Sequence, residues 1–408
     1  MTTEFAPREA GFMATASGSY ARLRAHGPIH HEHETGIFFV LDYALAVEVM
    51  RDHDRFSSQV DRASMRAGGM PAEVLAIRQQ GWPMALTLSH NDAPSHDAFR
   101  KIVAPFFLPR GLARIRPFIE ARTDDLVSGL PAGQPFDLVS ALAVPLPIAV
   151  IGALLGMSHL GDSSLKRWSD AFADEIGFLT STERAIEIAH ETLACHQAMM
   201  RLVDERRGGT ADDVISVLAN ACIDDRPLEP GEILSILTQL LVAGNETTTA
   251  TLTFAVVRLA RDPGLVERLR ADRDKIAPFI EEVLRLDSPI QGQFRKAVAD
   301  ETLGGISIPS GSLLHIRFGS ANRDETVWGP DDDRLQLDQK PPAPHMAFGM
   351  GLHFCVGAAL SRLELQLALN TLLDRFSRWS LADPSAPLPF RTHFHHRNLL
   401  SLDVEFRE

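Results

Sequence analysis

A ten-residue segment near the C-terminal end of the sequence surrounds one cysteine with three glycines. It reads Phe348-Gly349-Met350-Gly351-Leu352-His353-Phe354-Cys355-Val356-Gly357 and directly precedes an amphipathic helix. Glycine permits positive φ and close backbone approach, so this segment can fold beneath a flat ligand and turn backbone N–H groups toward the sulfur. Such donors, with the N-terminal end of the following helix, favour a thiolate, the form of cysteine that binds metals. Cys195 and Cys222 lack these flanks, and we interpret them as small hydrophobic residues.

A second candidate lies in a long apolar stretch that is interrupted by Ala243-Gly244-Asn245-Glu246-Thr247-Thr248. Burying an unpaired carboxylate costs several kcal/mol, so Glu246 should have a partner or a chemical role. A threonine hydroxyl can bond the carbonyl four residues earlier and bend or widen the helix, and Gly244 would leave space for a groove there. An acid beside an alcohol suits general acid catalysis through a relay. Taken alone, a local ion pair of Glu246 with merely packed threonines is an equally good interpretation.

Charged residues at helical spacing supply two further pairs. Glu282 and Arg285 are three apart, and His96 and Arg100 are four apart, so each pair lies on one helix face. A carboxylate and a guanidinium at this spacing can form an ion pair, whereas two basic side chains can face one anion. Either pair would also be ordinary on an exposed surface.

The elements that must position these residues are mainly helical. Residues 232–259 form a long helix candidate of roughly 42 Å, at 1.5 Å per residue, introduced by Pro230 and Gly231 and stopped by Asp262 and Pro263. Further helices are expected over DKIAPFIEEVLRL and ALSRLELQLALNTLLDRF, and short strands over GIFFVLDY and TLGGISIPSGSLLHI. We predict a mainly α fold with small β-sheets and a single domain over residues 1–408, since no repeat or long linker divides the chain.

Composition excludes several classes of function. The formal charge of -13 from 40 basic and 53 acidic residues argues against a nucleic-acid surface. No run approaches the roughly 18 apolar residues that span a bilayer, and the N-terminus lacks the layout of a secretory signal. With three cysteines a disulfide framework is improbable. We expect a cytoplasmic protein without a membrane anchor.

The pattern F-G-x-G-x-H-x-C-x-G closely resembles the signature of the cytochrome P-450 superfamily of haem-thiolate monooxygenases. The other motifs follow in the family's order over nearly the whole chain. The resemblance implies haem b between the long helix and the Cys355 loop with its following helix, and Cys355 as the ligand of the haem iron. The Ala-Gly-x-Asp/Glu-Thr motif implies that Ala243 and Gly244 lie beside the haem, and that Glu246 and Thr247 are the catalytic acid and alcohol.

The resemblance also assigns the remaining basic and loop residues. It implies that His96, Arg100, Arg295 and His353 contact the haem propionates, and that Glu282 and Arg285 are a buried structural pair with Arg334 as a looser third partner. The residues expected to contact the haem from the loop are Phe348, Gly349 and Gly357.

By the same analogy, the substrate pocket draws on residues 82–88, 172–178, 242–243 and 289–292. The side chains predicted to line it are Leu86, Thr87, Phe178, Val242, Ile290 and Gln291, with Thr87 or Gln291 as polar anchors. No flavin or nicotinamide fingerprint is evident, so electrons should come from a ferredoxin or flavodoxin with its reductase. The basic residues expected near the thiolate side are Lys101, Arg110, Arg114 and Arg362.

The predicted function is a monooxygenase that inserts one oxygen atom from dioxygen into a small or medium, mainly hydrophobic organic substrate, as in hydroxylation. The alternative within the superfamily is a peroxide-using or isomerising enzyme, which the Glu246–Thr247 pair disfavours. A non-enzymatic haem binder or gas sensor ranks third, since no signalling segment is evident.

Two groups of histidines fall outside this scheme. They are His30, His31 and His33 near the start, and His393, His395 and His396 near the end. Neither group is completed by a carboxylate or cysteine at diagnostic spacing, so a metal role is improbable. We predict that both lie in solvated loops or edge strands.

Overall fold

The computed structural model describes residues 7, 9, 11–60, 69–177, 181–330 and 333–408. It is mainly helical with small sheets, as the sequence predicts. Its contacts divide the chain into two compact units. Unit 1 comprises residues 1–57, 117–146 and 247–408, and unit 2 comprises residues 58–116 and 147–246. The prediction of a single domain over 1–408 stays a prediction.

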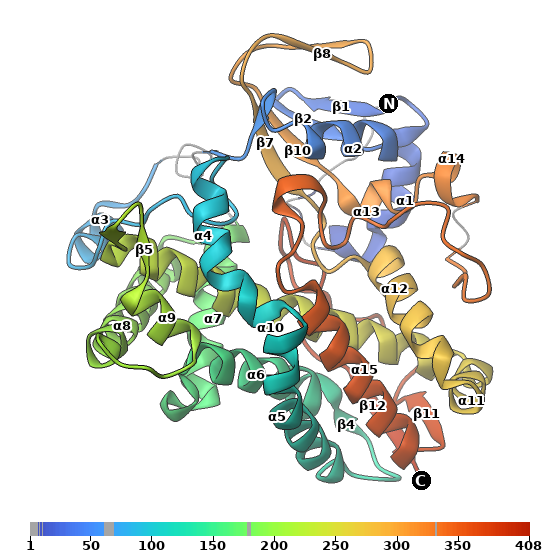
Figure 1. The fold of residues 1–408 in the computed structure, drawn as a ribbon. Coiled ribbons are helices and arrows are strands. Elements are labelled where there is room, and N and C mark those ends of the chain that lie inside the picture. Colours follow the sequence, from blue (N-terminus) through green and yellow to red (C-terminus); the bar gives the residue numbers. More distant parts are fainter. Residues whose placement is uncertain (1–6, 8, 10, 61–68, 178–180, 331–332) are drawn as a thin grey trace. The chain divides into compact units, whose positions relative to one another are not determined.

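Unit 1 contains a five-stranded sheet of order β1-β2-β10-β7-β3. The strands are β1 (Ile29–Glu32), β2 (Ile37–Val40), β10 (Leu313–Ile316), β7 (Gln293–Ala297) and β3 (Phe56–Ser57). The β8–β9 hairpin (Glu301–Leu303, Ile306–Ile308) extends beyond this sheet (Figure 1). A second sheet has the order β11-β12-β4, from Arg378–Leu381, Asp403–Arg407 and Phe136–Asp137. The strands expected over GIFFVLDY and TLGGISIPSGSLLHI are therefore confirmed.

Helices of unit 1 pack around these sheets through apolar faces. They are α1 (Phe12–Arg24), α2 (Tyr43–Arg51), α11 (Pro263–Ala271), α12 (Ile276–Asp287), α13 (Phe318–Ala321), α14 (Glu325–Trp328) and α15 (Ala358–Arg375). The two helices predicted around the cysteine segment are confirmed as α12 and α15, which lie side by side (Figure 1). Buried residues recur every three to four positions along most of α15, as expected for a helix with one face in the core.

Unit 2 is almost entirely helical. Its helices are α3 (Ala72–Arg78), α4 (Ser95–Val103), α7 (Asp162–Gly177), α8 (Thr182–Arg206) and α9 (Val214–Asn220), with one hairpin of β5 (Cys222–Ile223) and β6 (Arg226–Pro227). Helices α7 and α8 begin with an acidic first turn, which complements the helix dipole. Helices α5 (Pro109–Ser128) and α6 (Pro145–Leu155) contribute residues to both units.

The long apolar helix is α10 (Pro230–Arg261), which also contributes to both units. It is helical through the polar segment around Glu246, and the local bend or widening expected there stays a prediction. Back-bonding to the carbonyl four residues earlier occurs along this helix, where the Thr251 hydroxyl donates to Thr247 O at 2.8 Å and that of Thr253 to Thr249 O at 2.7 Å. Among the described residues, no helix has both the length and the apolar character needed to cross a membrane.

The two histidine groups lie in different surroundings. His30 and His31 are half-buried on β1, the edge strand of the sheet, as predicted. His393, His395 and His396 are instead buried, with exposed fractions of 3–5%. The prediction of a solvated position is wrong for this second group, because its rings pack among aromatic side chains.

Candidate functional site

The segment that carries Cys355 is shaped by glycines and by backbone hydrogen bonds. Gly349 and Gly351 adopt φ of +69° and +65°, which side chains rarely tolerate. A Cβ on Gly351 would lie 2.5 Å from Met50 O of α2, so only glycine fits this approach. The Cys355 N–H donates to Phe348 O at 2.8 Å and closes the loop. Gly357 plays a different part, because its φ of -85° is ordinary and it is the N-cap of α15.

Side chains of α12 and α15 hold this loop from outside. The Glu281 carboxylate accepts from Arg362 Nε at 2.7 Å and from His345 Nε2 at 3.1 Å. Although burial raises its pKa, these two hydrogen bonds hold the pKa of Glu281 at about 2. Arg362 also stacks over the Phe348 ring at 4.5 Å, and its raised pKa reflects chiefly the bond to Glu281, with a smaller contribution from Cys355. A cation thus lies close enough to the cysteine to interact with it electrostatically.

The predicted structural pair is buried in the same unit. Arg285 donates to both oxygens of Glu282 at 2.8 Å and to Asn322 O at 3.1 Å. Glu282 also accepts from the backbone N–H of Gln336 at 2.8 Å. The ion pair is therefore bidentate and tied to the loop that precedes the cysteine segment.

In unit 2, Glu246 is 4% exposed and lies among side chains of α7. Lys166 Nζ lies 3.4 Å from Glu246 Oε1 and also pairs with Asp170. Asn245 Nδ2 donates to Ser169 Oγ at 3.1 Å and lies 3.4 Å from the Glu246 carboxylate. This network was missed at the sequence level, because 80 positions separate Lys166 from Glu246 and no local pattern connects them.

Lys166 also lines a surface pocket of about 470 Å³ in unit 2. The pocket is bordered by Ser163, Arg167, Asp170, Arg184, Glu187 and Glu191. Because the Lys166 side chain is 26% exposed and that of Glu246 only 5%, their contact connects a buried acid with a surface pocket. A Cβ on Gly244 would lie 2.9 Å from Ile151 of α6, so this glycine permits close packing of the two helices, and the groove expected beside it stays a prediction. Ala243, one residue earlier, is exposed.

Thr247, the predicted alcohol, follows Glu246 in α10 and belongs to unit 1. It is half-buried, and its carbonyl accepts from Thr251. The next residue, Thr248, lies 3.1 Å from Ser361 Oγ, which joins α10 to α15, the helix that follows Cys355.

The basic residues expected to meet propionates are divided between the units. His96 and Arg100 lie on α4 of unit 2, where His96 is 1% exposed and its Nδ1 donates to Asp97 at 2.9 Å. Arg295 on β7 and His353 in the loop belong to unit 1. Arg295 is 3% exposed, with Nη1 donating to Phe294 O at 2.7 Å.

The predicted substrate residues differ in their surroundings. Leu86 is 51% exposed, Val242 is buried and Ile290 is half-buried, whereas Phe178 lies outside the described residues. Both predicted polar anchors have protein partners. Thr87 accepts from Gln239 Nε2 at 2.7 Å, while Gln291 accepts from the Tyr20 hydroxyl at 2.9 Å and donates to Ser288 O at 2.7 Å.

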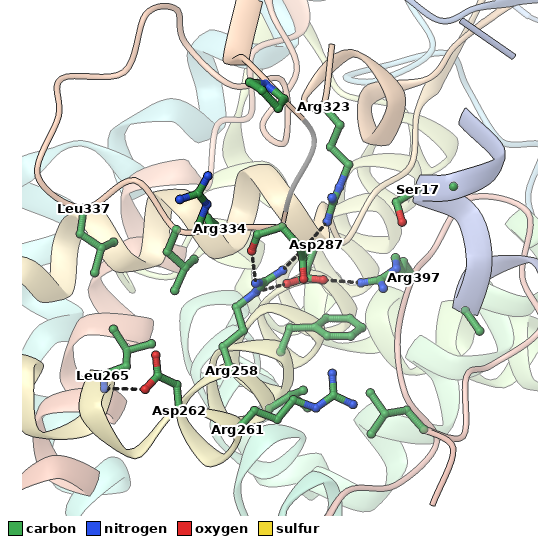
Figure 2. A pocket seen from close by; sticks show the side chains of 18 of the residues that line it. Ser17, Arg258, Arg261, Asp262, Leu265, Asp287, Arg323, Arg334, Leu337 and Arg397 are labelled. Carbon is green, nitrogen blue, oxygen red and sulfur yellow. Dashed lines mark hydrogen bonds and ion pairs between the residues drawn. The ribbon is translucent and has the colours of Figure 1, made fainter. Parts of the chain in front are cut away.

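A larger pocket of about 1010 Å³ lies in unit 1, and its lining includes several arginine and acidic side chains. Figure 2 shows Arg258 and Arg397 pointing toward Asp287, and each bonds it at 2.6 Å. Arg323 and Arg334 also line the pocket. None of the residues predicted to contact haem or substrate is among its lining residues. We interpret it as an ion-pair network that joins α10, α12 and the C-terminal segment.

The residues of the cysteine segment fit an iron porphyrin. A loop that only glycines can form places a thiol before a helix N-terminus and near a guanidinium, which suits a thiolate. In the same unit, the buried Arg295 matches the need of a propionate for a cation and a donor.

Comparison with known proteins agrees with this chemistry. The family model described as cytochrome P450 matches residues 148–396. Putative cytochrome P450 126 of Mycobacterium tuberculosis is 32% identical over 94% of this chain and 90% of its own length. Linalool 8-monooxygenase of Pseudomonas putida is 30% identical over 92% of each chain. The solved structure of cytochrome P450 CREJ in complex with (4-ethylphenyl) dihydrogen phosphate is 27% identical, covers 99% of this chain and 100% of that one, and superposes with a TM-score of 0.92.

Proposed function

Because the chain belongs to the cytochrome P450 family, we propose that it is a reductase-dependent monooxygenase that inserts one oxygen atom from dioxygen into an organic substrate. The enzyme is a haem-dependent oxidoreductase, and its relatives are named as monooxygenases, hydroxylases and epoxidases. The proposed cofactor is haem b, and the proposed location is the cytoplasm. The observation that carries the proposal is Cys355, in a loop shaped by two positive-φ glycines directly before α15.

Cys355 would hold the iron through its sulfur, and His96, Arg100, Arg295 and His353 would bind the propionates. When bound, the haem supplies the redox centre at which dioxygen is activated, and an anionic sulfur ligand favours cleavage of the O–O bond. The role of the protein is to bind and orient the haem, and to keep the sulfur anionic through the nearby Arg362.

Glu246 and Thr247 would deliver protons. Glu246 is held at Oε1 by Lys166, whose ammonium borders the surface pocket of unit 2. A proton can pass from water in this pocket to the Glu246 carboxylate, which then donates to the Thr247 hydroxyl, the next residue of α10. A buried acid with a solvent-connected partner favours dioxygen chemistry over the peroxide-using or isomerising alternative, which needs no such proton supply.

The proposed substrate is small or medium in size and mainly hydrophobic. Apolar side chains such as Val242 and Ile290 support this, and the ligand of CREJ combines an ethylated aromatic ring with a phosphate. With Thr87 and Gln291 bonded to protein groups, their proposed role as polar anchors would require exchange of these bonds.

The first experiment compares absorption spectra of the dithionite-reduced protein under carbon monoxide for wild type and Cys355→Ser. We expect a strongly red-shifted Soret band in wild type and its loss in the variant, because thiolate ligation produces this band. A haem-free wild-type protein, or a band unaffected by the substitution, would refute the haem-thiolate assignment.

A second experiment tests the proposed ferredoxin or flavodoxin partner. Arg110 is exposed, whereas Arg114 pairs with Asp212 and stacks on Phe106 at 5.6 Å, so Arg110 is the cleaner position to change. Arg110→Glu should slow reduction of the haem by an acidic ferredoxin and leave substrate binding unchanged. Unchanged reduction kinetics would show that Arg110 is not part of the docking surface. Turnover with peroxide alone would favour the alternative function.

A further inference from the structure

The connection between α3 and α4 contains a segment, residues 83–89, that forms neither helix nor strand. Residues 82–87, all of which the structure describes, form no hydrogen bond between backbone groups. Thr87 in this segment is nevertheless 0% exposed. A buried segment without backbone pairing must be held by side chains of another element, and these side chains belong to α10 in the same unit.

Three residues of α10 at a spacing of four, Gly231, Ser235 and Gln239, contact this segment. A Cβ on Gly231 would overlap the carbonyl oxygen of Pro83, so the two backbones touch there. Ser235 Oγ accepts from the Ala85 N–H at 3.0 Å. Four helical residues rise about 6 Å and two extended residues span about 6.6 Å, so the segment can meet successive turns of α10 in register.

Gln239 makes the most complete of these contacts. Its Oε1 accepts from the Ser89 N–H at 2.8 Å and from the Ser89 hydroxyl at 2.7 Å. Its Nε2 donates to Thr87 Oγ1 at 2.7 Å and to Ser235 O at 2.9 Å. A carboxamide offers two acceptor sites and two N–H donors, and all four are used here. We call these four hydrogen bonds the Gln239 latch.

The Gln239 latch determines where Leu86 lies. Neighbouring side chains of an extended segment point to opposite sides, and Leu86 is 51% exposed whereas Thr87 is 0% exposed. Residues 82–88 are proposed to line the substrate pocket. Ala243, one turn beyond Gln239 on the same face of α10, is exposed as well. A ligand bound next to this turn would meet a wall whose position the Gln239 latch sets.

We propose that Gln239 is a positioning residue that limits the size of the substrate, because its latch keeps Leu86 from moving away from a bulky ligand. This inference rests on the proposed monooxygenase function and deepens its substrate class, since a latched wall favours compact apolar molecules. Without Gln239, the bond between Ala85 and Ser235 still holds the near end of the segment, and the far end can move outward.

The main test is Gln239→Met, which keeps the length and helix propensity of the side chain but removes the Gln239 latch. The probes are 1-phenylimidazole and 1-tritylimidazole, which bind haem iron through the same type of nitrogen and differ in bulk. Titration of the haem-loaded protein, followed by the Soret shift, gives the two dissociation constants. Their ratio, trityl over phenyl, should fall at least about tenfold from its wild-type value. An unchanged or higher ratio would overturn the proposal.

The matched control is Gln197→Met. Gln197 is exposed on α8 of the same unit, so the same chemical change there should leave both dissociation constants at their wild-type values. Loss of size selection in this control as well would show that Gln239 has no specific role.

Hydrogen exchange measured by mass spectrometry gives a second readout that does not depend on activity or on a ligand. Amides of residues 83–89 should exchange at least about tenfold faster in Gln239→Met than in wild type, because the hydrogen bonds that hold the segment are gone. Exchange in Gln197→Met should match wild type. Equal exchange in all three proteins would refute the Gln239 latch.

Thr87→Val provides an independent route if Gln239→Met does not fold. This variant keeps the shape of the side chain and removes the hydroxyl that accepts from Gln239. The ratio of dissociation constants should fall in the same direction by a smaller factor. The double variant should behave like Gln239→Met alone, because both changes remove the same hydrogen bond. Additive effects would show that the two residues act separately and would count against the proposal.

Failure of this inference is distinguishable from failure of the monooxygenase function. The reduced carbon-monoxide spectrum depends on Cys355 and not on the position of residues 83–89. A normal spectrum with an unchanged ratio of dissociation constants would reject the Gln239 latch alone, whereas a wild-type protein without the red-shifted band would reject the proposed function.

Discussion

The loop that carries Cys355 takes its shape from residues adjacent in sequence, whereas Glu246 is held by Lys166 from 80 positions away. In the first region, positive-φ glycines and backbone hydrogen bonds determine where the functional side chain lies. In the second, an uninterrupted helix presents the acid, and side chains of α7 decide its surroundings.

This difference predicts different sensitivities. A site built from backbone conformation fails when one residue cannot adopt that conformation, and cofactor binding and stability are lost together. A site built from side chains on regular helices can lose its chemistry while the fold persists. Four predictions examine this contrast, from the largest expected effect to the smallest.

Gly351→Ala should damage the cysteine loop most. The new Cβ would lie 2.5 Å from Met50 O and 3.3 Å from Arg51 Cα, in addition to the cost of positive φ. We expect a loss of more than about 3 kcal/mol in the free energy of unfolding, together with poor haem incorporation. Gly305→Ala is the matched control, because its φ is +80° with nothing within 4 Å of the Cβ, and it should cost only about 1 kcal/mol. Equal losses in both variants would show that close approach to α2 is unimportant.

His196 offers a test of the packing between helices of unit 2, the unit that contains Glu246. It bonds Thr238 of α10 at 3.1 Å and stacks on Phe172 of α7, and burial, assisted by the charge of Arg78, lowers its pKa from 6.5 to about 4. The folded state favours the neutral ring, so this contribution is fully present above pH 6.5 and is lost as pH falls toward about 4.

Over that window, wild type should lose about 3 kcal/mol more than His196→Gln, which cannot titrate. Urea unfolding followed by circular dichroism at several pH values measures the difference. Parallel pH profiles for the two proteins would contradict the prediction.

Lys166→Gln should separate chemistry from folding in unit 2. With the ammonium removed, proton supply through Glu246 should weaken, and dioxygen-dependent turnover should fall about 10- to 100-fold, a typical effect of lost acid–base catalysis. The carbon-monoxide spectrum should not change, and unfolding should stay cooperative at a lower temperature, because the buried Glu246 loses its cation. The control is Arg167→Gln. Arg167 lies on the same helix but pairs with Glu191 and not with Glu246, so this variant should leave turnover intact. Full activity in Lys166→Gln would remove this residue from the proton route.

Glu281→Gln should have the smallest effect. It removes a charge that supports the cysteine loop, and the quantity that changes is the free energy of unfolding at low pH. The Arg362 and His345 bonds hold its pKa at about 2 despite burial, so its contribution is present above pH 4.5 and is lost as pH falls toward about 2. Because a third of the side chain is exposed to screening, we expect wild type to lose only about 1 kcal/mol more than the variant in this window. Acid unfolding curves provide the measurement, and coincident curves would show that the ion pair is energetically neutral.

Much of the fold follows from the sequence because its signals are local. The limits of α10, α12 and α15 are marked by proline, by helix-stopping residues and by apolar periodicity, and the glycines around Cys355 require a special backbone. The packing at Gly244 could not be predicted in the same way. A Cβ there would meet Ile151 of another helix, and sequence spacing does not reveal which neighbour packs against a small residue.

The histidines show that local sequence patterns do not predict burial. His30 and His31 lie on an edge strand as predicted, but His395, in a similar sequence pattern, is buried against His315. Both groups consist of closely spaced histidines, so composition could not separate them. The pairing of β10 with β2 and β7, and the packing of residues 393–396 on that sheet, made the difference.

The sequence by itself determined the chemistry available to this protein. A cysteine among glycines and an acid beside a threonine predict a thiolate ligand and a proton donor, because these properties depend on residue type and adjacent backbone. Only the tertiary structure decided that Lys166 holds Glu246 and that the buried His396 forms a β-bridge with Ile290. Burial and long-range contacts set the charge environment of each side chain, and they arise from chain packing that no local pattern encodes.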